Sequence, residues 1–149
     1  MLSKRLIKLY DNNCNITISK IMSCERHIKN LEISILEKTN QANDFLSEVN
    51  TLWGDVRDKA LQQSELFMLK RKESLILFRR DALLLEISET NQLLMECVSQ
   101  KCDFEKLRLY YQKKKKKWEL VLSNQKKIRL RKELYRDEKA MEEHIIWSS

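Results

Sequence analysis

Three groups of side chains in this sequence have the chemistry to form a site: four cysteines, two histidines and a dense run of cations. The cysteines are Cys14, Cys24, Cys97 and Cys102, and none forms a C-x-x-C pair of the kind that structural zinc sites use. We therefore expect no metal site and four free thiols, which act as small buried apolar residues in a reducing compartment.

No catalytic residue is predicted. Carboxylates and lysines alternate along the chain at the spacing of helical salt bridges. Two paired helices offer no cavity of the few hundred Å³ that small-molecule sites need. The sequence therefore predicts a protein that is not an enzyme and binds no cofactor.

The composition favours helices over every other element. The 149 residues include one glycine and no proline, with 42% hydrophobic and 34% charged residues. The tight turns of a β-sheet need glycine or asparagine, so an all-α single domain over residues 1–149 is expected. The longest apolar runs, 75–78 and 82–85, are too short to cross a bilayer. We expect no membrane insertion and a cytoplasmic location.

Two apolar stripes with a seven-residue period run along the chain, as in a coiled coil. The first joins Ile7, Cys14, Ile21, Ile28, Ile35, Ala42, Val49 and Val56, and its companion joins Tyr10, Thr17, Cys24, Leu31, Lys38, Phe45, Leu52 and Lys59. The second joins Leu69, Ile76, Leu83, Thr90, Cys97, Phe104, Tyr111 and Trp118, beside Leu93, Leu107, Val121, Ile128 and Tyr135. The two stripes are out of phase, and the break falls between residues 55 and 64.

The phase break predicts the turn of an antiparallel coiled-coil hairpin. We expect one helix over about 2–55, a turn over about 56–64, and a longer helix over about 65–146, with Ser64 as its cap and Glu65 in its first turn. The alternative is one continuous helix that dimerises in parallel, which typical helix lengths disfavour. Pairing about the turn would place Ile28 opposite Leu93 and Leu31 opposite Thr90. About the last 29 residues would then have no helix beside them.

The net charge of +7 comes from one part of the chain. Residues 113–136 carry eleven lysines and arginines against two glutamates, whereas residues 1–112 are nearly balanced and residues 137–144 are acidic. Such a run is compatible with a solvated helix face, with nucleic acid, or with an acidic protein surface that orders the overhanging helix. The aromatic side chains lie on or beside the apolar stripe, which argues against a stacking platform for nucleic acid.

Residues 113–146 resemble the C-terminal part of the InvI/SpaM stalk proteins of bacterial type III secretion systems. The shared features are five lysines before Trp118, the basic run after it, and an acidic end that closes in Ile145 and Ile146. Residues 64–80 are similar in pattern too. The resemblance implies a hairpin related to flagellar FliJ and to YscO-type stalks, similar in shape to the γ subunit of rotary ATPases.

That resemblance also implies a virulence-associated function and a set of partners. Such stalks insert their terminal helices into the pore of the hexameric export ATPase at the cytoplasmic face of the apparatus. They link it to the cytoplasmic domain of the export gate and pass along secretion chaperones. We expect the ATPase contact at Lys126, Lys127, Arg129, Arg131 and Lys132. A second, weaker prediction places a gate or chaperone patch at Phe67, Leu75 and Phe78, unless these residues pack locally with Trp53 and Leu77.

Two other functions stay open from the sequence alone. A scaffolding coiled coil would use the same stripes without an ATPase contact. A basic coiled coil that binds nucleic acid would show affinity that falls steeply with salt.

Overall fold

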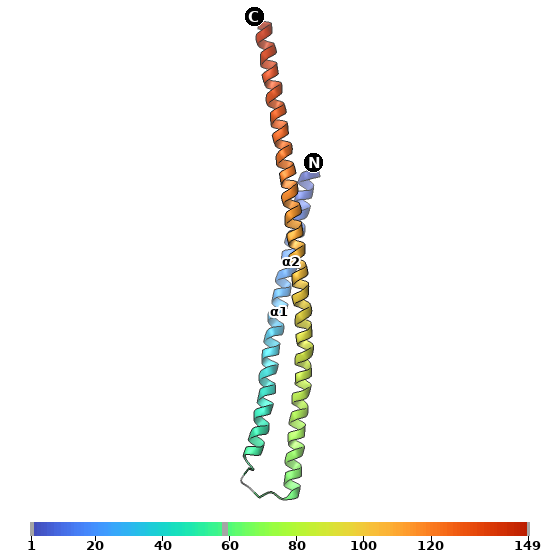
Figure 1. The fold of residues 1–149 in the computed structure, drawn as a ribbon, viewed down its shortest axis with the longest axis vertical. Helices are drawn as coiled ribbons and strands as arrows, with labels where there is room; N and C mark the ends of the chain where they lie inside the picture. The colour runs from blue at the N-terminus through green and yellow to red at the C-terminus, as the bar shows by residue number, and fades with distance from the viewer. Residues whose placement is uncertain (1, 58–59, 149) are drawn as a thin grey trace. The chain divides into compact units, whose positions relative to one another are not determined.

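The computed structural model describes residues 2–57 and 60–148, and within them the chain forms two long helices. Helix α1 spans Leu2–Gly54 and helix α2 spans Gln63–Ser148, with no strand among the described residues (Figure 1). The predicted fold class, all-α with two long helices of which the second is the longer, is confirmed. The predicted turn includes residues 58 and 59, which lie outside the described residues.

The ends of the two helices follow from local chemistry. α1 stops at Gly54, the single glycine of the chain, and its last turn tightens through a bond from the Val56 amide to the Trp53 carbonyl at 3.3 Å. α2 begins at Gln63, and the Leu66 amide donates to the carbonyl of Gln62 at 3.0 Å. Glu65 lies in the first turn as expected. Ser64 lies inside the helix, so its predicted capping role was wrong.

The chain divides into two compact units, each made of one part of α1 and one part of α2. The terminal unit comprises Met1–Ile21 with Asp103–Ser149, and the turn unit comprises Met22–Cys102. In the terminal unit Ser3 pairs with Gln125 and Asp11 with Lys115, and in the turn unit Glu25 pairs with Lys101. The two helices are therefore antiparallel in each unit. The single-domain organisation stays a prediction.

The apolar stripes face the opposite helix in both units. Every described residue of the first stripe and its companion is buried or half-buried, and Lys59 lies outside the described residues. The most buried apolar residues are Cys14, Ile21, Ala42 and Val49, at 3–7% exposure. The second stripe, from Leu69 to Trp118, is buried or half-buried throughout. These positions form the seam between the helices.

Four of the five companion positions predicted for the second stripe are exposed, and Val121 alone is half-buried as predicted. Leu93 is 51% exposed and Leu107 is 37% exposed, so they face away from α1. The inward positions are instead Glu73, Arg80, Ile87, Leu94, Lys101, Arg108, Lys115 and Leu122, all half-buried. Several are cations whose alkyl stems can cover the edge of the seam while the charge reaches water. A search for apolar residues alone does not find them.

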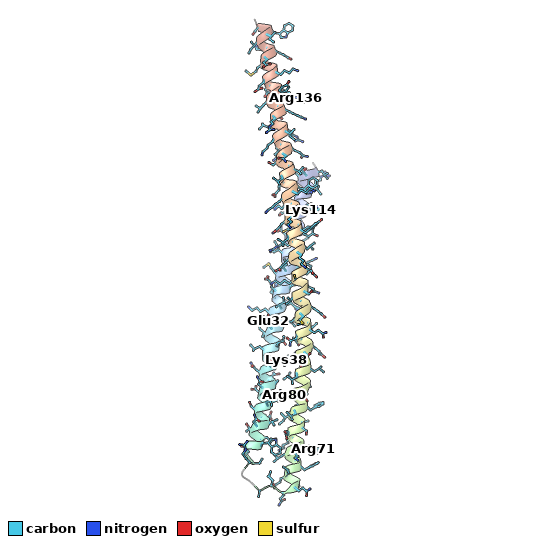
Figure 2. The ribbon with its side chains drawn as sticks, viewed as in Figure 1. Glu32, Lys38, Arg71, Arg80, Lys114 and Arg136 are labelled. Atoms are coloured by element: carbon cyan, nitrogen blue, oxygen red, sulfur yellow. The ribbon has the colours of Figure 1, made fainter. Side chains whose placement is uncertain are left out.

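The register between the helices differs from the predicted one by about four residues. Asp11 pairs with Lys115 and Glu25 with Lys101, whereas the predicted register placed them opposite residues near 110 and 96. Thr90 was expected opposite Leu31, but its hydroxyl accepts a hydrogen bond from the ammonium of Lys38, labelled in Figure 2, at 3.3 Å. The inward positions of a heptad recur every three or four residues, so a shift of about four residues pairs inward positions again, and the apolar pattern alone could not distinguish the two registers. The polar pair of Lys38 and Thr90 does.

Candidate functional site: the exposed end of α2

The final part of α2 extends past the first residue of α1 in the terminal unit (Figure 1). Every described residue from 123 to 148 is exposed to solvent, and we call residues 123–148 the exposed stretch. Large apolar side chains are exposed there too, among them Leu130 at 58%, Leu134 at 55% and Ile145 at 62%. Burial of such surface is worth about 25 cal/mol per Å², so the stretch carries a strong tendency to acquire a partner.

The exposed stretch begins later than the sequence indicated. Residues 121–149 were expected to lack a facing helix, but Val121 and Leu122 are half-buried and Gln125 hydrogen-bonds to Ser3. The register difference of about four residues accounts for this correction, because it moves the start of α1 further along α2. From residue 126 to residue 148 the remaining helix is about 35 Å long.

The structure distributes the five predicted cations around the helix. Lys126, Arg129 and Lys132 line an open hollow of about 540 Å³ together with Leu2, Ser3 and Lys4 at the start of α1. Lys127 and Arg131 fall on other sides of α2, because each residue advances about 100° around a helix. Arg136, labelled in Figure 2, continues the series. The cations thus surround the helix and do not form one basic face.

The same stretch lacks the ion pairs that hold cations in the seam. Among the described residues, the ion pairs within 4.0 Å are those of Lys38, Lys101 and Lys115. Lys115 is the best held, since its ammonium donates to the Asp11 carboxylate at 2.8 Å. That hydrogen bond and the negative charge of Asp11 raise the pKa of Lys115 above its ordinary value of 10.5. The five predicted cations of the exposed stretch are not in these ion pairs, and their charge is available for another molecule.

The aromatic residues before the exposed stretch are engaged within the chain. The ring centroids of Tyr10 and Tyr111 lie 6.3 Å apart, and those of Tyr110 and Tyr111 lie 5.6 Å apart. The Lys114 ammonium lies 5.6 Å from the centre of the Tyr110 ring. Single-strand binding relies on open rings that stack on bases. Tyr10, Tyr110 and Tyr111 are thus engaged within the chain, whereas Tyr135 and Trp147 in the exposed stretch are 66% and 89% exposed.

A second exposed surface lies in the first turns of α2, in the turn unit. Phe67, Leu75 and Phe78 are 68%, 53% and 71% exposed, whereas Trp53 and Leu77 are half-buried. An open hollow of about 620 Å³ is lined by Phe67, Met68, Arg71, Lys72, Ser74, Leu75 and Phe78, which we call the basic apolar patch. Both of its charged residues are basic.

Sequence reasoning missed four members of this patch. Met68, Arg71, Lys72 and Ser74 line the hollow but were not among the predicted residues. Arg71 is four residues after Phe67, and Ser74 and Leu75 are four and three residues before Phe78, which is the spacing of neighbours on one helical face. That spacing would have identified them if polar residues had been considered together with apolar ones.

The four cysteines lie at different depths in the structure. All four cysteines have free thiols; Cys14 is buried, Cys24 and Cys97 are half-buried, and Cys102 is exposed, so the expectation of burial was wrong for Cys102. In the part of the chain that the structure describes, no helix is apolar over enough length to span a membrane. No group of three possible metal ligands is found among the same residues.

The fold defines the class as an all-α protein of two long helices, the second of which ends in an exposed basic stretch. Comparison with protein families narrows this class. The family model for the Salmonella surface presentation of antigen gene type M protein matches residues 3–145, nearly the whole chain. The chain therefore belongs to this SpaM family and is a type III secretion protein of the SpaM/InvI type. No curated protein and no solved structure shows significant similarity to it.

Proposed function

We propose that this protein is the non-enzymatic central stalk of a type III secretion apparatus, and that the exposed end of α2 inserts into the pore of the hexameric export ATPase. The supporting observation is the exposed stretch itself, in which cations and apolar side chains surround a helix about 35 Å long. In proteins most helical stability comes from packing against another element, so the stretch gains most from a partner that encloses it. A ring of subunits is such a partner.

The cations define how the ring is held. Lys126, Lys127, Arg129, Arg131 and Lys132 point to different sides of α2, so one stalk can meet acidic or carbonyl groups on several subunits at once. Because one stalk faces six equivalent subunits, these contacts differ from subunit to subunit. Unequal contacts would bias the nucleotide states of the ring. We propose that the protein shares this action with flagellar FliJ and the YscO-type stalks, to which it would be related.

The experiment is co-purification of the stalk with the export ATPase after charge reversal. Changing Lys126, Lys127, Arg129, Arg131 and Lys132 to Glu should abolish binding, because five attractive charges become repulsive. The matched control changes five exposed lysines outside the stretch to Glu, and these are Lys8, Lys29, Lys106, Lys113 and Lys116. The far-UV helix signal should be kept by both variants. Equal binding by both variants would contradict the proposal.

The link to the export gate and to secretion chaperones is assigned to the basic apolar patch. Phe67, Leu75 and Phe78 are exposed there although water disfavours such side chains, which is typical of a binding surface. Alanine at Phe67 and Phe78 should block secretion and leave the urea unfolding midpoint unchanged. A large fall in that midpoint would show that the two rings have a packing role.

A scaffolding coiled coil is the second candidate, and the register correction bears on it. The seam of the turn unit includes the polar pair of Lys38 and Thr90, and polar residues in a seam specify one pairing among several. Such a seam suits a defined hairpin better than promiscuous coiled-coil pairing. If the protein were a scaffold, reversing the five cations between residues 126 and 132 would leave its binding to partner coiled coils unchanged.

A further inference from the structure

The basic apolar patch and the acidic end of α2 are complementary in charge. Residues 67–79, which span the patch, carry four cations and one glutamate. Residues 137–145 carry Asp137, Glu138, Glu142 and Glu143 against Lys139 alone. Over the whole segment 134–145, the four carboxylates stand against Arg136 and Lys139, so its net charge is negative while that of residues 67–79 is positive. Opposite charges of similar size on two exposed surfaces favour their association and steer it.

The two surfaces also match in their apolar spacing. Phe67 and Phe78 are eleven residues apart in the patch, and Leu134 and Ile145 are eleven residues apart in the exposed stretch. Eleven residues are close to three full helical turns, so each pair lies on one face of its helix. All four side chains are more than half exposed. Two helical faces with the same apolar repeat can pack ridge into groove.

A charged residue lies between the apolar residues of each pair. Arg71 lines the hollow between Phe67 and Phe78, and Glu138 and Glu142 lie between Leu134 and Ile145. Arg71 and Glu138 each stand four residues after the first apolar residue of the pair, so each lies on the same helical face as that residue. Contact between the two faces would bring a guanidinium beside carboxylates and would bury the flanking apolar groups.

We infer that the occupant of the basic apolar patch, in protein not engaged by the secretion apparatus, is residues 134–145 of a second copy of this chain. The contact is between two chains because both surfaces belong to α2, which continues without a break from Gln63 to Ser148. The association is head to tail, so each chain can offer both its patch and its helix end. The association covers the exposed apolar side chains of both the basic apolar patch and residues 134–145 of the free protein.

This inference goes beyond the stalk function and does not depend on it. It uses residues 134–145, whereas the proposed ATPase contact uses cations between residues 126 and 132. Self-association is measured without the ATPase, and ATPase binding is measured on its own. Failure of one therefore leaves the other standing.

The test is sedimentation velocity of the full chain at rising concentration with charge reversals on each surface. The wild-type mass should rise with concentration, and salt should weaken this rise. R71E/K72E alters the patch and E138K/E142K alters the helix end, and each should weaken self-association at least about tenfold. K8E/K29E and E32K/E37K reverse matched exposed charges elsewhere and should self-associate like the wild type.

Combining the reversals makes the test specific. An equal mixture of R71E/K72E and E138K/E142K should associate again, because each altered surface then meets an opposite charge. The chain with all four changes should regain self-association for the same reason. A wild-type chain that stays monomeric, or patch and end variants that associate like the wild type, would overturn the inference. So would a mixture that fails to associate. If a secretion chaperone bound the basic apolar patch of a chain that stays monomeric, the occupant of the patch would be the chaperone, and the inference would be overturned.

Discussion

The seam and the exposed stretch of α2 share one helix but differ in what satisfies their side chains. Within the terminal unit, Tyr111 and Lys115 face α1, where Lys115 bonds to Asp11 at 2.8 Å. Beyond residue 123 every described side chain is exposed, including Leu130 and Tyr135. One helix of 86 residues thus has a part that packs against α1 and a part that packs against nothing in the described chain. The seam holds the two helices together, and we propose that the exposed stretch binds another molecule.

Charge in the seam should break the fold, whereas charge in the exposed stretch should not. Ala42 is 3% exposed, so Ala42→Asp buries a carboxylate without a partner and should cost about 3–5 kcal/mol of stability. Leu134→Asp changes a residue that is 55% exposed and should cost little. Urea unfolding followed by circular dichroism measures both. Equal losses in the two variants would remove the distinction between seam and stretch.

The polar pair in the seam should be replaceable with a gain in stability. Lys38 is partly buried beside the buried hydroxyl of Thr90, and it meets Glu86 only at 3.9 Å. Replacing Lys38 and Thr90 together by Leu should raise the free energy of unfolding by about 1–2 kcal/mol, as for other buried polar groups exchanged for apolar ones. The same change should allow registers a heptad apart. A destabilised double variant would show that the polar contacts outweigh apolar packing.

Removal of the exposed stretch should affect binding far more than stability. A chain that ends at Gln125 keeps the contact with Ser3 and every seam residue, so its urea midpoint should correspond to a stability within about 0.5 kcal/mol of the full chain. Its binding to the export ATPase should be lost. A clear fall in the midpoint would mean that the stretch stabilises the paired helices directly.

The smallest effect is expected at alkaline pH. Because Asp11 raises the pKa of Lys115 above 10.5, the folded state holds this proton more tightly than the unfolded state does. The resulting stability is fully present below pH 10.5 and is lost as pH rises through the raised pKa. Asp11→Asn should therefore remove a small part of the alkaline loss. Urea midpoints at pH 8 and above pH 11 compare the two chains, and an identical pH dependence would contradict the assignment.

The sequence was sufficient for the fold class because its physical basis is periodic. Without proline and with one glycine, nothing interrupts the helices except the segment around Gly54, and Ile7 to Val56 mark one face without a gap. The apolar pattern could not determine the register, because inward positions recur every three or four residues and a shift of about four residues pairs them again. The hydrogen bond between Lys38 and Thr90 distinguishes the registers, yet in the apolar pattern both residues counted only as interruptions. The inward cations Arg80, Lys101 and Lys115 were missed for the same reason.

The sequence identified the candidate site by its charge, but it did not predict how the site residues are placed in the structure. Lys126 to Lys132 stood out as a cluster in the sequence, yet which of them lie beside the start of α1 depends on the register. Exposure of Phe67, Leu75 and Phe78 depended on the phase of α2 against α1. Spacing along one helix could have included Arg71 with them. The partner of either surface depends on another molecule.

Hydrogen exchange of the backbone amides in residues 123–148, with and without the export ATPase, tests directly whether this helix end inserts into the ring. We expect fast exchange in the free protein, measured at a concentration where it is monomeric, because the exposed stretch has no helix beside it. Strong protection of the same amides is expected in the complex, with little change in the seam around Cys14 and Ile21. Equal exchange of residues 123–148 in both states would contradict insertion of this helix end into the ring.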